Sequence, residues 1–318
     1  MRIVKLSALP GRLAIKWLAL AVLLPAAAGA QAMYKYRDAN GQWVYTDRKP
    51  DESVAIETLD LGSSESLSPR ITIEQVRTTE AAVLRAINDC ACPVEFGLRI
   101  VNAENVDVPG SGTYSQTVPA RSFLDLVVLP AIGNAEPSIA FDWGYVIGEP
   151  NVKHAPARPY RVPFAVARSF PVSQAYPSTY THVDPASRHA IDIAMPEGTA
   201  IYAARGGVVI DVAHGNFKSG IARELADKAN FVRILHADGT FAIYAHLRWD
   251  SIRVRPGQNI ERGEFIATSG NTGFSSGPHL HFAVMRNVGL RIEALPVMFE
   301  GPGGSALMAR EGQALTAY

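Results

Sequence analysis

The segment S-G-P-H-L-H-F-A-V, residues 276–284, constrains this chain more than any other feature. It places His279 and His281 two residues apart at the start of an apolar run. Side chains alternate between the two faces of a β-strand, so a strand here presents both imidazoles on one face. Two such imidazoles are half of a metal site. A carboxylate and another histidine from elsewhere in the chain would complete it.

Two upstream segments supply the missing groups. The segment A-I-D-I-A places Asp192 inside a short apolar strand. Its flanking isoleucines are expected to face a core, which turns Asp192 to the opposite face. The segment A-I-Y-A-H-L places His246 at the end of a strand that follows a D-G dipeptide, a strong two-residue hairpin signal. A glycine-punctuated loop, residues 269–277, then leads into the histidine pair.

Three motifs together carry a family resemblance: D-I-A-x-P-x-G-T, Y-x-H-L and S-G-N-T-G-x-S-x-G-P-H-L-H-F. In these motifs, and over residues 165–300, the chain resembles the LytM/lysostaphin family of zinc metalloendopeptidases. The resemblance implies an antiparallel β-sheet with an open groove, one Zn²⁺ per chain, and cleavage of peptide bonds in peptidoglycan. Residue by residue, it implies that Asp192 and His281 are zinc ligands and that His246 and His279 are catalytic residues that do not bind the metal.

The first zinc ligand is where this sequence departs from the family pattern. Most members have a histidine four residues before the aspartate, and that position is Arg188 here, which cannot bind Zn²⁺. A catalytic zinc site needs three protein ligands and one open position. His182, in a loop broken by a proline, is the preferred third ligand. His189 is the alternative, although on a continuous strand it would face away from Asp192. An incomplete site is the remaining alternative.

Residues 1–32 are predicted to be a secretory signal. They have a basic start, an apolar core at residues 17–24, and small residues suited to cleavage. The core is shorter than the roughly 20 residues of a membrane-spanning helix, so no stable span is expected after cleavage; a retained anchor is the alternative. Removing four basic residues from 30 leaves 26 against 30 acidic residues, a net charge of −4. That charge gives no electrostatic basis for nucleic-acid binding.

The rest of the chain is predicted to be all-β and divided into modules. Residues 33–50 form a small β module around Asn40-Gly41, which resembles a domain of unknown function common in secreted proteobacterial proteins. Residues 51–70 are expected to be a linker, 71–148 a β-sandwich-like domain, and 149–163 a proline-rich connection. The peptidase domain is expected at 164–300, followed by a mobile tail at 301–318.

The two cysteines, Cys90 and Cys92, leave two alternatives open. Export would place them in an oxidising compartment, which favours a disulfide. On a regular strand, however, their Cβ atoms would be too far apart, so a disulfide needs a bulge or a turn at this point. Two free thiols are the other alternative.

These observations predict an exported, zinc-dependent endopeptidase, periplasmic or secreted, that acts on the peptide stems of peptidoglycan. Two alternatives come from other functional classes. One is a non-catalytic regulator of cell-wall amidases, since some domains of this family only activate amidases. The other is a secreted protease that acts on proteins. Regulatory proteins of the cell envelope are possible partners in either case.

Overall fold

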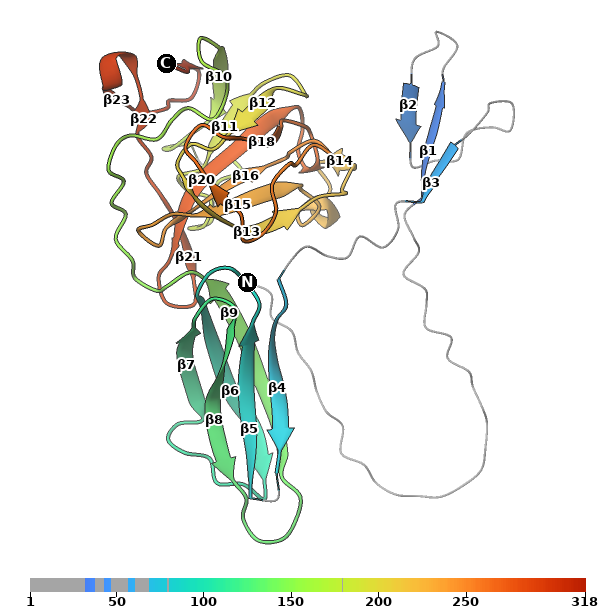
Figure 1. Ribbon diagram of the computed structural model, residues 1–318, viewed down its shortest axis with the longest axis vertical. Coiled ribbons are helices and arrows are strands. Elements are labelled where there is room, and N and C mark those ends of the chain that lie inside the picture. The colour runs from blue at the N-terminus through green and yellow to red at the C-terminus, as the bar shows by residue number, and fades with distance from the viewer. Residues whose placement is uncertain (1–31, 38–42, 47–56, 61–68, 79, 179) are drawn as a thin grey trace. The chain divides into compact units, whose positions relative to one another are not determined.

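The computed structural model describes residues 32–37, 43–46, 57–60, 69–78, 80–178 and 180–318. Within them, nearly all regular structure is β-strand, and the only helical parts are the 3-10 turns Arg223–Leu225 and Pro302–Gly304 (Figure 1). The predicted all-β fold class is therefore confirmed. No helix of the described part is long and apolar enough to cross a membrane. The predicted signal, apart from its last residue, lies outside the described residues.

The described residues before 61 form a compact unit of their own. Its antiparallel sheet has the order β2-β1-β3, with β1 at Ala32–Arg37, β2 at Trp43–Thr46 and β3 at Glu57–Asp60. The pairing of β1 with β2 agrees with the hairpin predicted around Asn40-Gly41, residues that lie outside the described ones. The prediction of a linker over 51–70 is wrong at β3, because that strand pairs with the free edge of β1.

Residues 71–148, the sandwich, form two antiparallel three-stranded sheets, as the alternating sequence predicts. One sheet has the order β4-β5-β8, with bounds Ile71–Arg77, Ala81–Asn88 and Ser122–Pro130. The other has the order β7-β6-β9, with bounds Thr113–Val118, Val94–Glu104 and Ser138–Ile147. Every second residue of β5 is buried, and the apolar ones, Ala82, Leu84 and Ala86, join inward-facing residues of β6 and β8 in one hydrophobic cluster.

Residues 164–318, the C-terminal domain, are built on a nine-stranded sheet with the order β17-β13-β15-β16-β20-β11-β10-β24, to which β21 adds beside β20. In that order the strands are Asn259–Ile260, Gly207–Ala213, Phe231–Leu235, Phe241–Ala245, His279–Asn287, Ile191–Ala194, Ser169–Gln174 and Ala314–Thr316, with β21 at Ile292–Leu295. All of these pairings are antiparallel.

Three smaller strand pairs complete the described C-terminal domain. The pair β12 (Ala200–Tyr202) and β18 (Phe265–Thr268) is antiparallel, as is the pair β22 (Phe299–Glu300) and β23 (Ala306–Leu307). The pair β14 (Ser219–Gly220) and β19 (Gly273–Phe274) is parallel. This last pair joins the loop after β13 to the glycine-rich loop that precedes the histidine pair.

The two faces of strand β20 contact different cores. One face is buried in the core of the C-terminal domain through Leu280, Phe282 and Val284. The other face carries His279 and His281 at its start and Ala283 and Met285 further along. These last two side chains are buried in the cluster that also contains the core of the sandwich. The sandwich therefore packs on the same face of the sheet that presents the two histidines.

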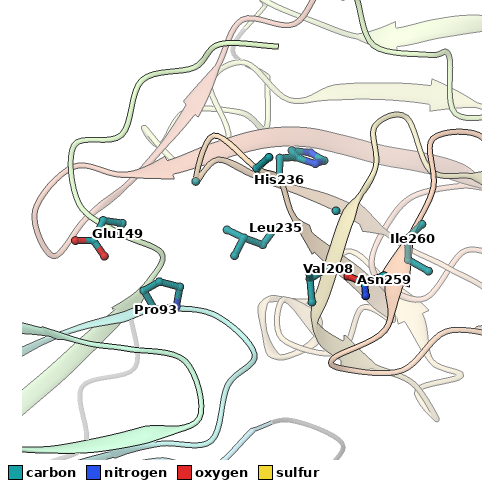
Figure 2. Close-up of a pocket in the computed structure, with 10 residues that line it drawn as sticks. Pro93, Glu149, Val208, Leu235, His236, Asn259 and Ile260 are labelled. Atoms are coloured by element: carbon teal, nitrogen blue, oxygen red, sulfur yellow. The ribbon is translucent and has the colours of Figure 1, made fainter. Parts of the chain in front are cut away.

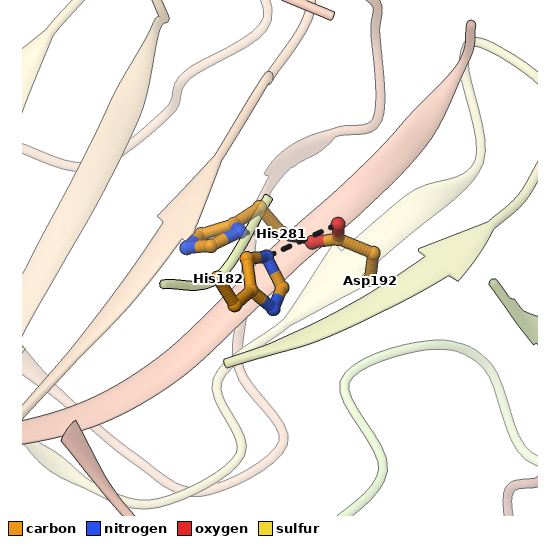
Figure 3. A group of neighbouring side chains, drawn as sticks. All are labelled: His182, Asp192 and His281. Atoms are coloured by element: carbon orange, nitrogen blue, oxygen red, sulfur yellow. Dashed lines mark hydrogen bonds and ion pairs between the residues drawn. The ribbon is translucent and has the colours of Figure 1, made fainter. Parts of the chain in front are cut away.

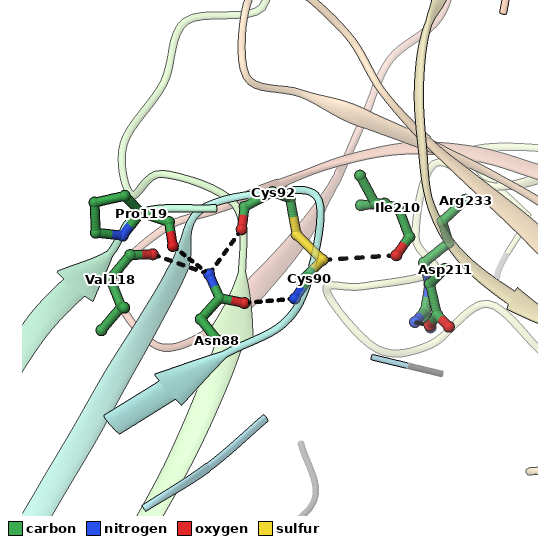
Figure 4. The surroundings of a disulfide bond; sticks show 8 residues. All are labelled: Asn88, Cys90, Cys92, Val118, Pro119, Ile210, Asp211 and Arg233. Carbon is green, nitrogen blue, oxygen red and sulfur yellow. Dashed lines mark hydrogen bonds and ion pairs between the residues drawn. A yellow bond between two sulfur atoms is a disulfide. The ribbon is translucent and has the colours of Figure 1, made fainter. Parts of the chain in front are cut away.

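The turn between β5 and β6 is part of this contact (Figure 4). Cys90 and Cys92 form a disulfide there, with Cα atoms 5.2 Å apart, so the disulfide alternative holds and a turn makes it possible. The side chain of Asn88 supports the turn: it accepts a hydrogen bond from the Cys90 N–H and donates to three carbonyl oxygens. The Cys90 Sγ lies 3.6 Å from the carbonyl oxygen of Ile210 on β13.

A buried carboxylate ties the far end of β20 to the sandwich. Glu95 of β6 accepts a hydrogen bond from the Asn287 side-chain amide at 2.8 Å and another from the Leu290 N–H at 2.7 Å. The same Asn287 amide donates to the carbonyl oxygen of Gly148. The strand that begins at His279 thus ends in contact with the sandwich.

The C-terminal residues differ from the predicted mobile tail. Strand β24 pairs with β10 and extends the main sheet, with Ser169 opposite Thr316 and Phe170 opposite Leu315. Leu315 and Ala317 are buried in the core of the C-terminal domain. Glycines at 301, 303 and 304 suggested mobility, but they only form the turn that brings the chain back to the sheet. The domain therefore extends past residue 300.

We predict that Leu315→Ala lowers the free energy of unfolding by about 2–5 kcal/mol, because it removes a fully packed side chain. The matched control is Met308→Ala, since Met308 is 47% exposed in the same segment; its change should stay within about 0.5 kcal/mol. Urea denaturation of the two variants measures the difference. Equal, small changes in both would mean that the tail does not contribute to the core.

Candidate metal centre and catalytic residues

The histidine pair and Asp192 meet through strand register. β20 lies between β11 and β16, and His281 pairs with Asp192 on one side and with Ala245 on the other. Asp192 and His281 therefore project from adjacent strands onto the same face. The His281 Nδ1 lies 2.8 Å from the Asp192 Oδ1 (Figure 3). The isoleucines beside Asp192 are buried in the domain core, as the sequence predicts.

His182 reaches this pair from a loop between β10 and β11. Its Nε2 lies 3.2 Å from the Asp192 Oδ2, and its side chain is buried (Figure 3). One nitrogen or oxygen from each of His182, Asp192 and His281 lies within 4.8 Å of the others. The structure thus brings together the three residues predicted as zinc ligands.

The sequence did not single out Gln174, which supports His182. When the oxygen and nitrogen of the Gln174 side-chain amide are exchanged, both atoms form hydrogen bonds. The oxygen then accepts from the His182 Nδ1 at 3.2 Å and from the His182 N–H at 3.0 Å. Metal-binding histidines usually donate through their second nitrogen in this way, which fixes the ring. The only sequence signal was its inward position on the alternating strand β10.

The donor set fits a zinc ion. A neutral imidazole that donates through Nδ1 to Gln174 keeps a lone pair at Nε2, the atom nearest to the carboxylate of Asp192. A cation between these two electron-rich groups satisfies both. Two imidazoles and one carboxylate, with a fourth position open, is the donor set of a catalytic zinc site.

The alternative ligand, His189, lies elsewhere. The chain turns at residues 185–189, and β11 begins only at Ile191. His189 is therefore not part of the strand that carries Asp192, and the alternation of side chains along that strand does not determine where His189 points. Its ring contacts the ring of Tyr176, with centroids 4.6 Å apart, and it is not part of the metal-binding group.

The carboxylate of Asp192 is kept ionised by its neighbours. Burial alone would raise the pKa of Asp192. The adjoining imidazoles of His182 and His281 outweigh burial and hold the pKa below its ordinary value. The carboxylate is therefore available as an anionic ligand at neutral pH.

His246 and His279 lie side by side next to the metal-binding group, with ring centroids 4.5 Å apart. The His246 Nδ1 donates to the carbonyl oxygen of Thr272 at 2.6 Å, and the His279 Nδ1 donates to that of Gly277 at 2.8 Å. Because a carbonyl can only accept, both hydrogens are placed at Nδ1 and both Nε2 atoms keep a lone pair. The His279 Nε2 lies 3.9 Å from the Asp192 Oδ1.

The electrostatics favour a neutral His246. Burial, followed by the neighbouring imidazoles of His279 and His281, lowers the pKa of His246 to about 4. At neutral pH the side chain is therefore a proton acceptor rather than a cation.

A separate pocket is not the site. An open hollow of about 520 Å³ lies where the sandwich meets the C-terminal domain, lined by Pro93 and Glu149 on one side and by Val208, Leu235 and Ile260 on the other (Figure 2). None of the predicted site residues lines it.

Comparisons with known proteins agree with this geometry. Residues 186–292 match Peptidase family M23, and residues 20–73 match Domain of unknown function (DUF4124). Peptidoglycan DD-endopeptidase ShyA of Vibrio cholerae is 36% identical over 100 residues, 31% of this chain and 20% of ShyA. DD-carboxypeptidase/endopeptidase Mpg of Neisseria meningitidis is 37% identical over 97 residues, 30% of this chain and 20% of Mpg. The matched segment thus spans about a fifth of each relative.

Among solved structures, the catalytic domain of lysostaphin from Staphylococcus simulans aligns with 26% identity and a TM-score of 0.28, covering 39% of this chain and 83% of that one. The donor group and the family match together support a zinc metallopeptidase domain. Residues 186–292 belong to peptidase family M23. His182 lies just before the matched segment, whereas Arg188, at the position where the family pattern has its first histidine, lies within it.

We predict that His182→Ala weakens zinc binding by more than about 100-fold, the loss that even a residue supporting a ligand can cause. His189→Ala is the matched control and should bind zinc like the parent protein. Zinc stoichiometry and competition with a chelator, measured on folded variants, decide between them. Normal zinc binding by His182→Ala together with loss in His189→Ala would reverse the assignment.

Proposed function

We propose that the chain is a zinc-dependent endopeptidase that hydrolyses peptide bonds in peptidoglycan cross-links. The observation that carries the proposal is the juxtaposition of a three-residue donor group with two imidazoles whose Nε2 atoms are free to accept a proton. A metal site alone would serve a structural role. A metal site beside two imidazoles that each keep a lone pair at Nε2 is suited to hydrolysis.

In this proposal His182, Asp192 and His281 hold the zinc ion, one per chain. A bound Zn²⁺ supplies a Lewis acid for the scissile carbonyl and lowers the pKa of water to about 7. Gln174 orients His182, and the ionised Asp192 balances part of the charge of the metal.

His246 and His279 are the proposed catalytic residues. Each is held through Nδ1 by a backbone carbonyl, so the ring cannot turn its Nε2 away from the site without losing that hydrogen bond. One Nε2 takes a proton from the attacking water as the water oxygen bonds to the carbonyl carbon. When the C–N bond breaks, the same imidazole returns this proton to the amine leaving group. The second imidazole, which also keeps a lone pair at Nε2, is placed to accept a hydrogen bond from the attacking water and so orient it.

The substrate class rests on the relatives. ShyA is named a peptidoglycan DD-endopeptidase and Mpg a DD-carboxypeptidase/endopeptidase. We extend the peptidoglycan peptide stem to this chain, and with it a location outside the cytoplasm, in the periplasm or secreted. Regulatory proteins of the cell envelope are proposed as further partners. The completeness of the donor group disfavours a purely regulatory role, because a regulator has no need of ligands or bases.

We predict that purified protein cleaves cross-linked muropeptides and that a chelator stops the cleavage. Mass spectrometry of the products, with and without chelator and added zinc, is the measurement. A protein substrate such as casein is the control for the secreted-protease alternative. Absence of chelator-sensitive cleavage of any muropeptide by zinc-loaded protein would favour the regulatory alternative.

Two single variants separate the proposed roles. His281→Ala should lose both zinc and activity. His279→Ala should keep its zinc and lose about 10²–10⁴ in kcat, the usual contribution of a proton-transfer or oxyanion group. Metal analysis beside kinetics makes the comparison, and equal zinc loss in both variants would contradict the assignment.

A further inference from the structure

Two buried polar side chains next to His246 have no part in the mechanism above. Thr272 lies in the glycine-rich loop and Asn230 directly precedes β15, and both are buried. Buried polar side chains are costly unless their hydrogen bonds are made, so the bonds they make indicate what they hold in place.

The backbone of His246 is strained. Its φ is +60°, in the left-handed region, immediately after β16 ends at Ala245. A residue other than glycine costs of order 1 kcal/mol or more there and keeps that conformation only when its surroundings impose it. At this position the strain ends the strand and determines the direction of the imidazole. The neighbouring contacts must therefore hold the conformation.

The backbone N–H and carbonyl oxygen of the next residue, Leu247, both form hydrogen bonds with Asn230 or Thr272. The Leu247 N–H donates to the carbonyl oxygen of Asn230 at 3.0 Å. The Leu247 carbonyl oxygen accepts from the Thr272 hydroxyl at 2.9 Å and from the Asn230 amide at 3.2 Å. The first bond holds the peptide that follows His246, and the other two hold the peptide that follows Leu247. Together they support the left-handed conformation of His246.

Thr272 also holds the ring of His246. Its carbonyl oxygen accepts from the His246 Nδ1 at 2.6 Å, while its hydroxyl accepts from the Asn230 N–H at 3.0 Å. The same residue thus binds the imidazole through its main chain and the His246–Leu247 backbone through its side chain. The ring and the backbone of His246 are positioned by one element.

Asn230 extends the arrangement to the segment after β13. Its side-chain oxygen accepts from the Asn216 N–H at 2.9 Å, and its amide donates to the Asn216 carbonyl oxygen at 2.7 Å. Three stretches that are distant in sequence, at Asn216, Leu247 and Thr272, are therefore all hydrogen-bonded to one buried residue, Asn230.

We infer that Thr272 and Asn230, the Thr272–Asn230 pair, are positioning residues that set the backbone, ring direction and tautomer of His246. The inference rests on the proposed function, in which His246 accepts a proton through Nε2. Neither side chain bonds to the metal-binding group. Their effect on turnover is exerted through His246.

The test compares Thr272→Val with Thr272→Ser. Valine keeps the shape and loses the hydroxyl, whereas serine keeps the hydroxyl. With muropeptide substrate and zinc-loaded full-length protein, Thr272→Val should lower kcat by about 10–100-fold, as small displacements of a catalytic group do. KM should stay within about two-fold and zinc content should be unchanged, because no substrate or metal contact is removed. Thr272→Ser keeps the hydroxyl, so its kcat should stay within about three-fold of the parent value.

The matched control is Thr240→Val. Thr240 is fully buried, and its hydroxyl donates to the Asp238 Oδ1 at 2.7 Å. It lies at the opposite end of the five-residue strand β16 from His246, about 17–20 Å away. This variant loses a comparable buried hydrogen bond and should keep the parent kcat. Equal losses in Thr272→Val and Thr240→Val would mean general destabilisation and would overturn the inference.

An NMR spectrum of the His246 imidazole reports its tautomer and gives a second measurement that does not depend on turnover. Long-range ¹H–¹⁵N correlation should show the Nδ1–H tautomer for His246 in the parent protein and mixed tautomers in Thr272→Val. If the parent cleaves no muropeptide, the proposed function fails, and this spectrum alone decides the inference. An unchanged tautomer overturns it.

Asn230→Asp provides a second test of the inference in case Thr272→Val does not fold. Asn230→Asp is isosteric, keeps the acceptor for the Asn216 N–H, and removes both amide donations. It should show the same loss of kcat and the same mixture of tautomers. Parent-like kcat and tautomer in folded Asn230→Asp would overturn the inference.

Discussion

The site depends on one buried carboxylate. Asp192 sits between the imidazoles of His182 and His281, which hold its pKa below the ordinary value despite burial. The ionised carboxylate adds a negative charge that offsets part of the charge of a divalent cation, which two neutral imidazoles do not supply. The position of Asp192 follows from backbone pairing, since β11 and β20 place it opposite His281. The register of two strands therefore determines both the charge and the geometry of the donor group.

Strand β20 performs two tasks on one face. His279 and His281 are the first two residues on this face of the strand. Ala283 and Met285 follow them on the same face and pack against the sandwich. At its end, Asn287 is held by the buried Glu95 of the sandwich. The opposite face is buried in the domain core through Leu280, Phe282 and Val284. A strand fixed on both faces and at its end has little freedom, and catalytic groups need such rigidity because small displacements reduce turnover.

Backbone carbonyls set the tautomer of the two neighbouring imidazoles, His246 and His279. Thr272 and Gly277 each accept a hydrogen bond from an Nδ1, which leaves each Nε2 as an acceptor. Burial lowers the pKa of His246 to about 4 and keeps that ring neutral. Both carbonyls belong to the glycine-rich loop before β20. The glycine-punctuated loop that leads into the histidine pair is therefore the element that orients both rings.

The sequence determined the all-β class, the shared face of His279 and His281, and the outward turn of Asp192, because a side-chain period of two is a local property of strands. Its family motifs also predicted Asp192 and His281 as zinc ligands, with His182 as the preferred third. Tertiary structure decided what local patterns do not contain. The turn at 185–189 places His189 outside the strand, so the alternation of side chains does not apply to it. Strand β10 brings Gln174 within hydrogen-bond distance of His182. The Cys90–Cys92 disulfide and the return of β24 to the sheet likewise depend on turns and long-range pairing, which no single segment encodes.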